Sequence, residues 1–103
     1  MAKLTLEPAP RFKKAVAIAV PGGDAVLVEF TFKHRTRTEL DALCESLSDR
    51  DPVDVLFDIA DAWELEAPMN RENVQAFVEN YQPASLAVFR TYVSELRLGK
   101  LGN

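Results

Sequence analysis

Alternating apolar residues predict a β-hairpin near the start of the chain. Apolar side chains recur with period two on both sides of the run Pro21-Gly22-Gly23-Asp24, and many of them are β-branched or aromatic. Proline and glycine at these positions are typical of a tight turn between two strands. We therefore expect an antiparallel hairpin over residues 12–33. Residues 1–11 include prolines, which lack a backbone N–H, and are expected to form an extended arm.

Helical spacing replaces this alternation in the rest of the chain. Apolar residues recur at intervals of three and four between residues 36 and 98, which predicts about four short amphipathic helices. Val88 and Tyr92 lie beside the main stripe of the last helix and widen its apolar band. The expected core stripes are Leu40, Leu43, Cys44 and Leu47; Val53, Leu56, Phe57, Ala60 and Trp63; Val74, Phe77, Val78 and Tyr81; and Leu86, Phe89, Val93 and Leu96.

Strands followed by helices indicate an α+β fold, with a small antiparallel sheet and helices packed on one of its faces. Side chains suited to helix N-termini support the predicted helix starts. We expect one domain over residues 1–103, a helical part over residues 36–98 and a frayed tail over residues 99–103. The expected N-caps are Thr36 or Thr38, Asp51 and Asn70.

The content of reactive side chains argues against an enzyme or a metal protein. The chain has one histidine, His34, and one cysteine, Cys44, and Cys44 lies on a core stripe. We therefore expect no catalytic residue, no metal site and no cofactor. A single cysteine forms no internal disulfide, which favours a reducing compartment. No stretch approaches the ~18 apolar residues of a membrane span, and we expect a cytoplasmic protein without a membrane partner.

Charge is divided unevenly along the chain, whose net charge is −4. Residues 1–38 hold seven basic and three acidic side chains, whereas residues 39–103 hold five basic and thirteen acidic ones. The two halves can attract each other within one molecule or between copies, which would allow head-to-tail self-association. The one basic cluster, residues 33–37, is either a solvated connector or the contact of a small nucleic-acid-binding regulator. The acidic total argues against nucleic acid.

Aspartates form a stripe on the second predicted helix, at Asp51, Asp54, Asp58 and Asp61, and the last three are the expected partner contacts. Asp54 and Asp58 are like charges one turn apart, and Asp58 and Asp61 lie near the negative end of the helix, so the arrangement is locally unfavourable. The stripe is either a solvated face or a docking face for a basic partner or a neighbouring subunit.

The chain resembles the phage tail assembly chaperones, small proteins made with the tail genes of long-tailed phages and prophages. The likeness covers nearly the whole chain in the expected order. It departs at Met69, where phenylalanine is frequent, and at Gln82-Pro83, where Pro-Gly is common. The matching stretches are Pro21-Gly22-Gly23; Glu29-Phe30-Thr31-Phe32-Lys33-His34-Arg35-Thr36-Arg37 with Glu39-Leu40; Trp63-Glu64-Leu65-Glu66-Ala67-Pro68-Met69-Asn70-Arg71-Glu72-Asn73-Val74; and Asn80-Tyr81-Gln82-Pro83-Ala84 with Tyr92 and residues 99–103.

This resemblance implies a chaperone that coats the tape measure protein and keeps it soluble until tail tube subunits polymerise around it. The family also implies a longer, frameshifted form that recruits tail tube protein, and Gly99-Lys100 is compatible with a slippery site. We expect self-association, with pairing between hairpin edges as one mode. The aromatic band Phe77, Tyr81, Phe89 and Tyr92 is expected to contact the tape measure protein, with burial in the core as the alternative.

Overall fold

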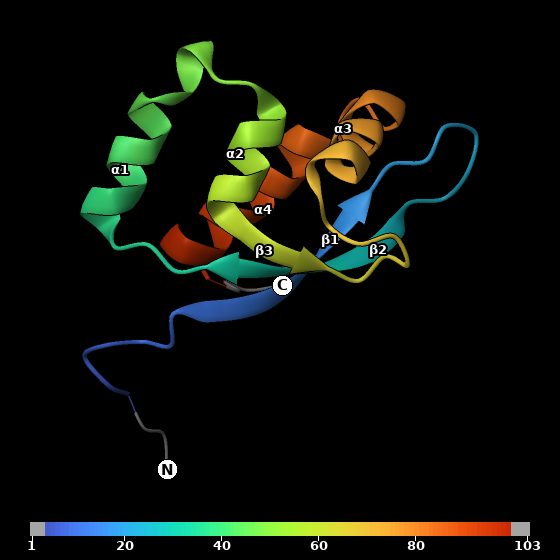
Figure 1. The fold of residues 1–103 in the computed structure, drawn as a ribbon. Coiled ribbons are helices and arrows are strands. Elements are labelled where there is room, and N and C mark those ends of the chain that lie inside the picture. The colour runs from blue at the N-terminus through green and yellow to red at the C-terminus, as the bar shows by residue number, and fades with distance from the viewer. Residues whose placement is uncertain (1–3, 100–103) are drawn as a thin grey trace.

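An antiparallel sheet of three strands organises the molecule, in the order β1-β2-β3. β1 (Arg11–Ile18) and β2 (Val26–Lys33) form the predicted hairpin, and β3 (Ala60–Trp63) pairs with the other side of β2. The structure is a computed structural model and describes residues 4–99 (Figure 1). Gly22, in the hairpin loop, has a φ of 76°, a conformation that glycine adopts without steric cost.

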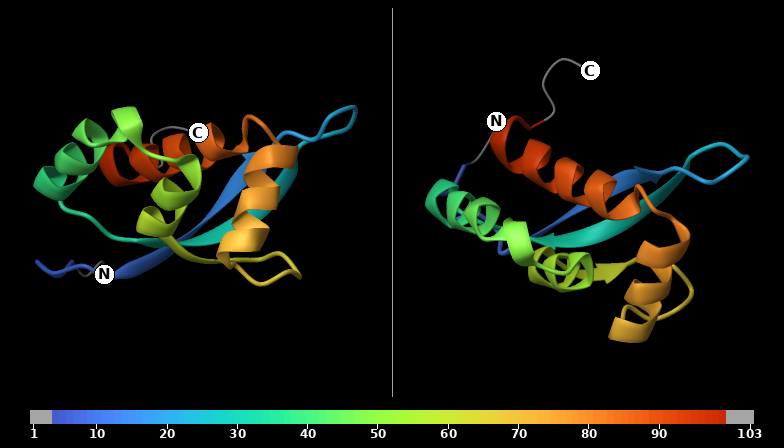
Figure 2. Two further views of the ribbon diagram at one scale, coloured as in Figure 1. Left: turned by 45° about the horizontal axis from the view of Figure 1, so that its top comes forward. Right: turned by 90° about the horizontal axis from the view of Figure 1, so that it is seen from above.

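Helices cover one face of this sheet (Figures 1 and 2), and the predicted α+β class with a hairpin before four helices is confirmed. On the covered face, Val16, Val28 and Phe32 are buried, whereas Lys13 and Ala15 on the opposite face are exposed. The helical elements are α1 (Arg37–Glu45), the short 3-10 helix η1 (Leu47–Asp49), α2 (Pro52–Ile59), α3 (Arg71–Asn80) and α4 (Ala84–Arg97).

Side-chain caps start the first three α-helices at predicted positions. Thr36 and Glu39 form a capping box, in which each side chain accepts a hydrogen bond from the other's backbone N–H. The bond from the Thr36 N–H also lowers the pKa of Glu39. Asp51 and Asn70 accept bonds from backbone N–H groups in the first turns of α2 and α3. Local sequence therefore determines these starts.

Both ends of the described chain extend beyond the sheet and helices. Residues 4–10 of the predicted arm are exposed and contain no strand. Gly99 has a φ of 63°, and its N–H donates to the Ser94 carbonyl, which ends α4. The remaining parts of the predicted arm and tail, residues 1–3 and 100–103, lie outside the described residues.

The third strand corrects the sequence analysis, which placed Ala60 and Trp63 on the second helix. That helix ends at Ile59, and the chain continues directly into β3. β2 would otherwise leave backbone groups unpaired along this edge, and pairing with residues 60–63 satisfies them. Trp63 then packs edge-on against Phe30, at a centroid distance of 6.2 Å. Pairing with β2 thus determines the structure of residues 60–63, although their apolar residues have helical spacing.

The buried face of α4 also differs from the predicted stripe. The structure buries Ala84, Val88 and Tyr92, which recur every four residues, and leaves Leu86 52% exposed. α4 lies along β1, so the residues that meet the sheet are those on this second line. The helix has two apolar lines, and sequence alone did not show which one faces the sheet.

Tyr92 joins the helical layer to the end of the hairpin. Its ring is fully buried and lies 5.3 Å from Phe32 and 6.2 Å from Phe12, measured between ring centroids. Its hydroxyl donates to the Lys33 carbonyl at 2.8 Å and accepts a bond from the Arg35 guanidinium at 3.0 Å. Burial raises the pKa of Tyr92, while the bond from Arg35 opposes that shift.

We predict that Tyr92→Phe destabilises the protein by about 1–2 kcal/mol, since it removes two hydrogen bonds and leaves the Lys33 carbonyl without its tyrosine donor. Urea unfolding monitored by circular dichroism measures this loss. Tyr81→Phe is the matched control, because the Tyr81 hydroxyl makes no hydrogen bond within residues 4–99. Equal losses in both variants would contradict the prediction.

The raised pKa of Tyr92 adds a pH dependence. Stability from the neutral phenol is present below the unfolded pKa of about 10 and falls as pH rises above it, because only the unfolded chain ionises readily there. The stability difference between the native chain and Tyr92→Phe should therefore shrink above pH ~10. A constant difference from neutral to alkaline pH would count against this assignment.

Candidate partner-binding surface

Apolar side chains remain on the surface where α4 runs beside α1. Leu86 is half exposed, and Phe89 and Val93 are only partly buried. Cys44 on α1 and Leu47 on η1 are also partly buried. Because α4 turns Val88 and Tyr92 toward the sheet, its other apolar line faces outward toward α1 and η1.

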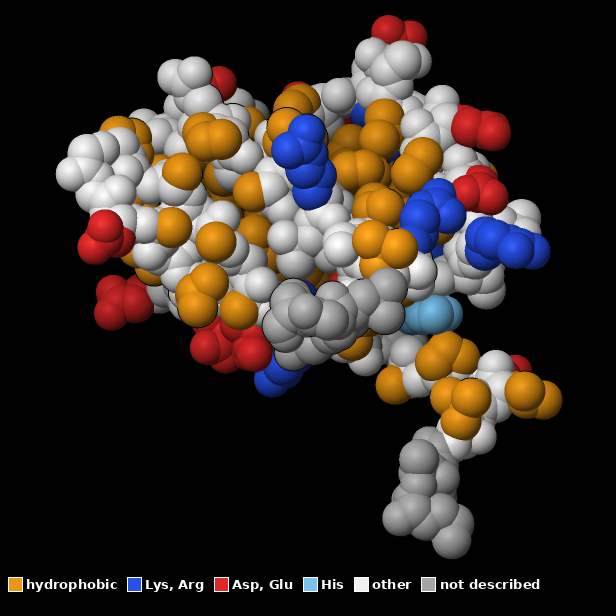
Figure 3. Space-filling view, turned by 180° about the vertical axis from the view of Figure 1, so that it is seen from behind, with side chains coloured by type: hydrophobic (Ala, Val, Ile, Leu, Met, Phe, Trp, Pro, Cys, Tyr) orange, Lys and Arg blue, Asp and Glu red, His pale blue; other side chains and the backbone are white. Residues whose placement is uncertain are grey.

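Three hollows follow this line along α4. The central one has a volume of about 470 Å³. Figure 3 shows a depression with hydrophobic side chains on this back face, flanked by Lys and Arg side chains. The residues that line the central hollow are Cys44, Phe89, Arg90, Val93, Ser94, Arg97 and Leu98.

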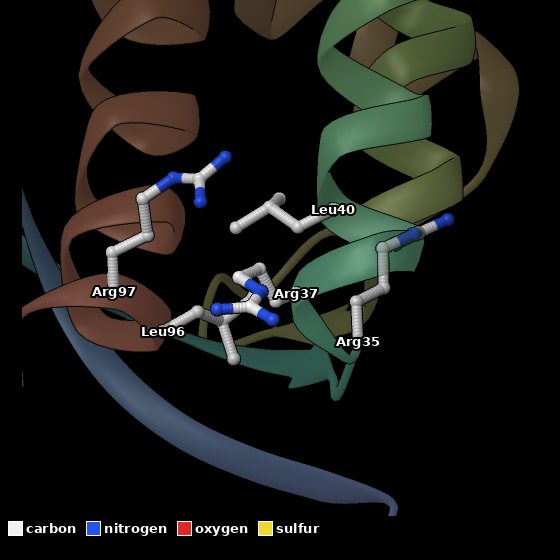
Figure 4. A pocket seen from close by; sticks show the side chains of 5 residues that line it. All are labelled: Arg35, Arg37, Leu40, Leu96 and Arg97. Carbon is white, nitrogen blue, oxygen red and sulfur yellow. The ribbon is translucent and has the colours of Figure 1, made fainter.

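Arginines dominate the hollow at the C-terminal end of α4, which has a volume of about 350 Å³. In Figure 4, Arg37 and Arg97 extend into the space between α1 and α4, whereas Arg35 extends away from it. Arg97 lines both this hollow and the central one, so the two are adjoining. The residues that line this hollow are Arg35, Arg37, Leu40, Leu96 and Arg97.

A third hollow of about 200 Å³ lies at the N-terminal end of α4 and shares Phe89 with the central one. We call the three together the α1–α4 groove. The third hollow is lined by Leu47, Arg50, Pro52, Val55, Leu56, Ser85, Leu86 and Phe89.

The groove is cationic in a protein with a net charge of −4. None of the described residues that line it is acidic. Arg97 is partly neutralised, because its guanidinium donates to Asp41 at 2.8 Å, and this bond raises the pKa of Arg97. Arg37 and Arg90 make no ion pair within residues 4–99.

The predicted aromatic band divides between the core and the surface. Tyr92 is fully buried and Phe77 is only 7% exposed, so both lie in the core, the alternative considered for this band. Tyr81 is partly buried and packs on Phe77 at 6.1 Å, away from the groove lining. Phe89 alone of the four lines the groove. Contact of these residues with a partner stays a prediction.

The three aspartates of the stripe that were expected to contact a partner each have a basic partner within the molecule, whereas Asp51 caps α2. Asp54 pairs with Arg71 at 2.7 Å, and Asp58 pairs with Arg50. Asp61 pairs with Arg11 and, at 3.7 Å, with Lys33. These intramolecular pairs offset the like-charge repulsion that the sequence pattern implies. Docking by this stripe stays a prediction, and a partner would have to compete with the existing pairs.

The basic cluster at residues 33–37 has a structural role. The Lys33 ammonium donates to the Phe57 carbonyl at 3.1 Å, and Arg35 donates to the Asp58 carbonyl at 3.0 Å. These carbonyls lie in the last turn of α2, where backbone acceptors lack helical partners and cations are favoured. Two of the cluster's cations therefore stabilise the end of α2.

Sequence reasoning placed Leu86, Val93 and Leu96 on a core stripe, selected Phe89 as a partner contact with the core as its alternative, and did not select Arg90 or Arg97. The sequence did contain a signal for an exposed apolar surface on α4. The apolar band of this helix is wider than one core requires, and such a band can form a partner surface. The packing of α4 on β1 shows which part of the band remains outside.

Residues 4–99 contain neither a cluster of metal ligands nor a helix suited to crossing a membrane. No group of three or more histidine, cysteine, aspartate or glutamate side chains there is placed to hold a metal ion. No helix in the same range is long and apolar enough to cross a membrane.

An α+β domain with an exposed apolar, cationic groove is suited to binding another protein. The family model described as phage tail assembly chaperone matches residues 1–103. The chain therefore belongs to the phage tail assembly chaperone family, whose members act as assembly factors. No curated protein and no solved structure matches the chain significantly.

We predict that Arg35→Ala destabilises the fold by about 1–3 kcal/mol, because it removes charged hydrogen bonds to the Asp58 carbonyl and the Tyr92 hydroxyl. Arg37→Ala, two residues away, should change stability by less than about 0.5 kcal/mol, since Arg37 is exposed and makes no ion pair within residues 4–99. Thermal and urea unfolding measure both. Equal effects would refute the structural role of Arg35.

Proposed function

We propose that this member of the family coats the tape measure protein, keeps it soluble and assists polymerisation of the tail tube around it. The family match supports a chaperone role in tail assembly. The observation that most supports the specific client is the α1–α4 groove, an exposed apolar surface between two helices.

A long amphipathic helix is a difficult client in water. Its apolar stripe aggregates unless another surface covers it. A groove between two helices accepts such a stripe in the helix-in-groove mode, because apolar side chains at helical spacing interdigitate with those of the groove. Small domains such as this one cover only a few turns each, so a long client requires many copies.

Binding of nucleic acid through residues 33–37 is the other candidate function. Hydrogen bonds from Lys33 and Arg35 to the end of α2 already occupy two of the cluster's cations, which favours the chaperone proposal. An electrophoretic shift at low salt distinguishes the two, since retardation of DNA would support the regulator.

Three further features belong to the same proposal. Copies of the chaperone self-associate on the client, with the hairpin edge formed by β1 as one contact. A frameshifted longer form recruits tail tube protein, and Lys100 of the predicted slippery site lies outside the described residues. Assembly takes place in the cytoplasm of the bacterial host.

Co-expression with the tape measure protein of the same tail gene cluster tests the client. We expect that protein to be soluble only with the chaperone and to elute with many copies of it. Leu86→Asp should weaken this binding by about tenfold or more, because a carboxylate in the groove would be desolvated.

Leu27→Asp is the matched control, since Leu27 is 71% exposed on the hairpin and Leu86 is 52% exposed in the groove. Leu27→Asp should leave solubilisation unchanged. A tape measure protein that is soluble alone and elutes apart from the chaperone would overturn the proposed function.

A further inference from the structure

The α1–α4 groove forms one continuous strip along α4. The central hollow shares Phe89 with one neighbour and Arg97 with the other. Leu86, Phe89, Val93 and Arg97 are spaced by three or four residues and so lie on one side of the helix. At about 1.5 Å per residue, the strip is roughly 16 Å long, which corresponds to three helical turns.

The charges around this strip select its ligand. Five arginines line the groove, and none of its described lining residues is acidic. Two of these arginines, Arg37 and Arg90, are exposed and have no carboxylate partner within residues 4–99. Arg37 lies on α1 and lines the C-terminal hollow, and Arg90 lies on α4 and lines the central one. A ligand that fills it therefore meets apolar side chains centrally and guanidinium groups along the sides.

We propose that the groove binds an amphipathic helix of about three turns whose apolar stripe is flanked by Asp and Glu residues. This inference rests on the proposed function, in that the helix is a segment of the tape measure protein. Carboxylates beside the stripe pair with Arg37 and Arg90, and the stripe covers Phe89 and Val93. Charge complementarity steers the encounter and disfavours basic helices.

The single cysteine of the chain reports directly on occupancy of the groove. Cys44 lines the central hollow and is partly exposed. The rate at which a thiol-specific disulfide reagent modifies Cys44 therefore measures how accessible this position is, and no substitution is needed. We expect Cys44 to react about tenfold more slowly in the purified complex with the tape measure protein than in the free chaperone, because a seated helix shields the thiol.

Charge reversal tests the acidic character of the client. Arg90→Glu should roughly halve the NaCl concentration at which the chaperone dissociates from the complex, because it replaces attraction by repulsion. The double variant Leu27→Asp/Gln75→Glu is the matched control, since it also lowers the net charge by two, at exposed positions outside the groove lining. It should leave that concentration unchanged.

The outcomes separate this inference from the proposed function. A stable complex in which Cys44 reacts as fast as in the free chaperone would overturn the groove inference and leave the chaperone function standing. Equal effects of Arg90→Glu and the Leu27→Asp/Gln75→Glu control would overturn the acidic character of the client. Protection of Cys44 in a self-associated form without the tape measure protein would assign the groove to a second copy. Failure to form any complex would overturn both proposals.

Discussion

The buried tyrosine of α4 is the contact on which the arrangement of layers depends. Tyr92 packs its ring on the aromatic side chains of the sheet and bonds its hydroxyl to the Lys33 carbonyl and the Arg35 guanidinium. Arg35 in turn donates to the end of α2. One side chain thus fixes α4, the end of β2 and the last turn of α2 together. The orientation of α4 set by this contact leaves its second apolar line facing α1.

Part of the charge asymmetry of the chain is balanced by ion pairs inside one molecule. Arg11, Lys14 and Lys33 in the basic front pair with Asp61 and Glu95 in the acidic back. These pairs are at least partly exposed, so each contributes little stability, but together they link the hairpin to β3 and α4. Self-association through the same charges would have to exchange these pairs, whereas the groove arginines Arg37 and Arg90 remain available.

Sequence reasoning predicted the features that are determined locally. The hairpin follows from alternation and a turn at Gly22, and the helix starts follow from Thr36, Asp51 and Asn70. Sequence reasoning was wrong where contacts between distant parts of the chain determine the structure. Ala60 to Trp63 obey a helical period, yet they pair with β2. α4 has two apolar lines, and only packing on β1 buries Val88 and leaves Leu86 exposed. The groove was therefore not predictable as a surface, although Phe89 was among the expected contacts.

The bond between Tyr92 and Lys33 joins residues 59 positions apart in the sequence. A ribosome releases the hairpin long before α4, and an isolated hairpin is only marginally stable in water. The aromatic side chains of β2 thus lack their helical cover for most of synthesis, and the domain closes only after residue 92 has emerged. Until then the aromatic face of the hairpin has no cover from α4, because the contact that closes the domain joins residues far apart in the sequence.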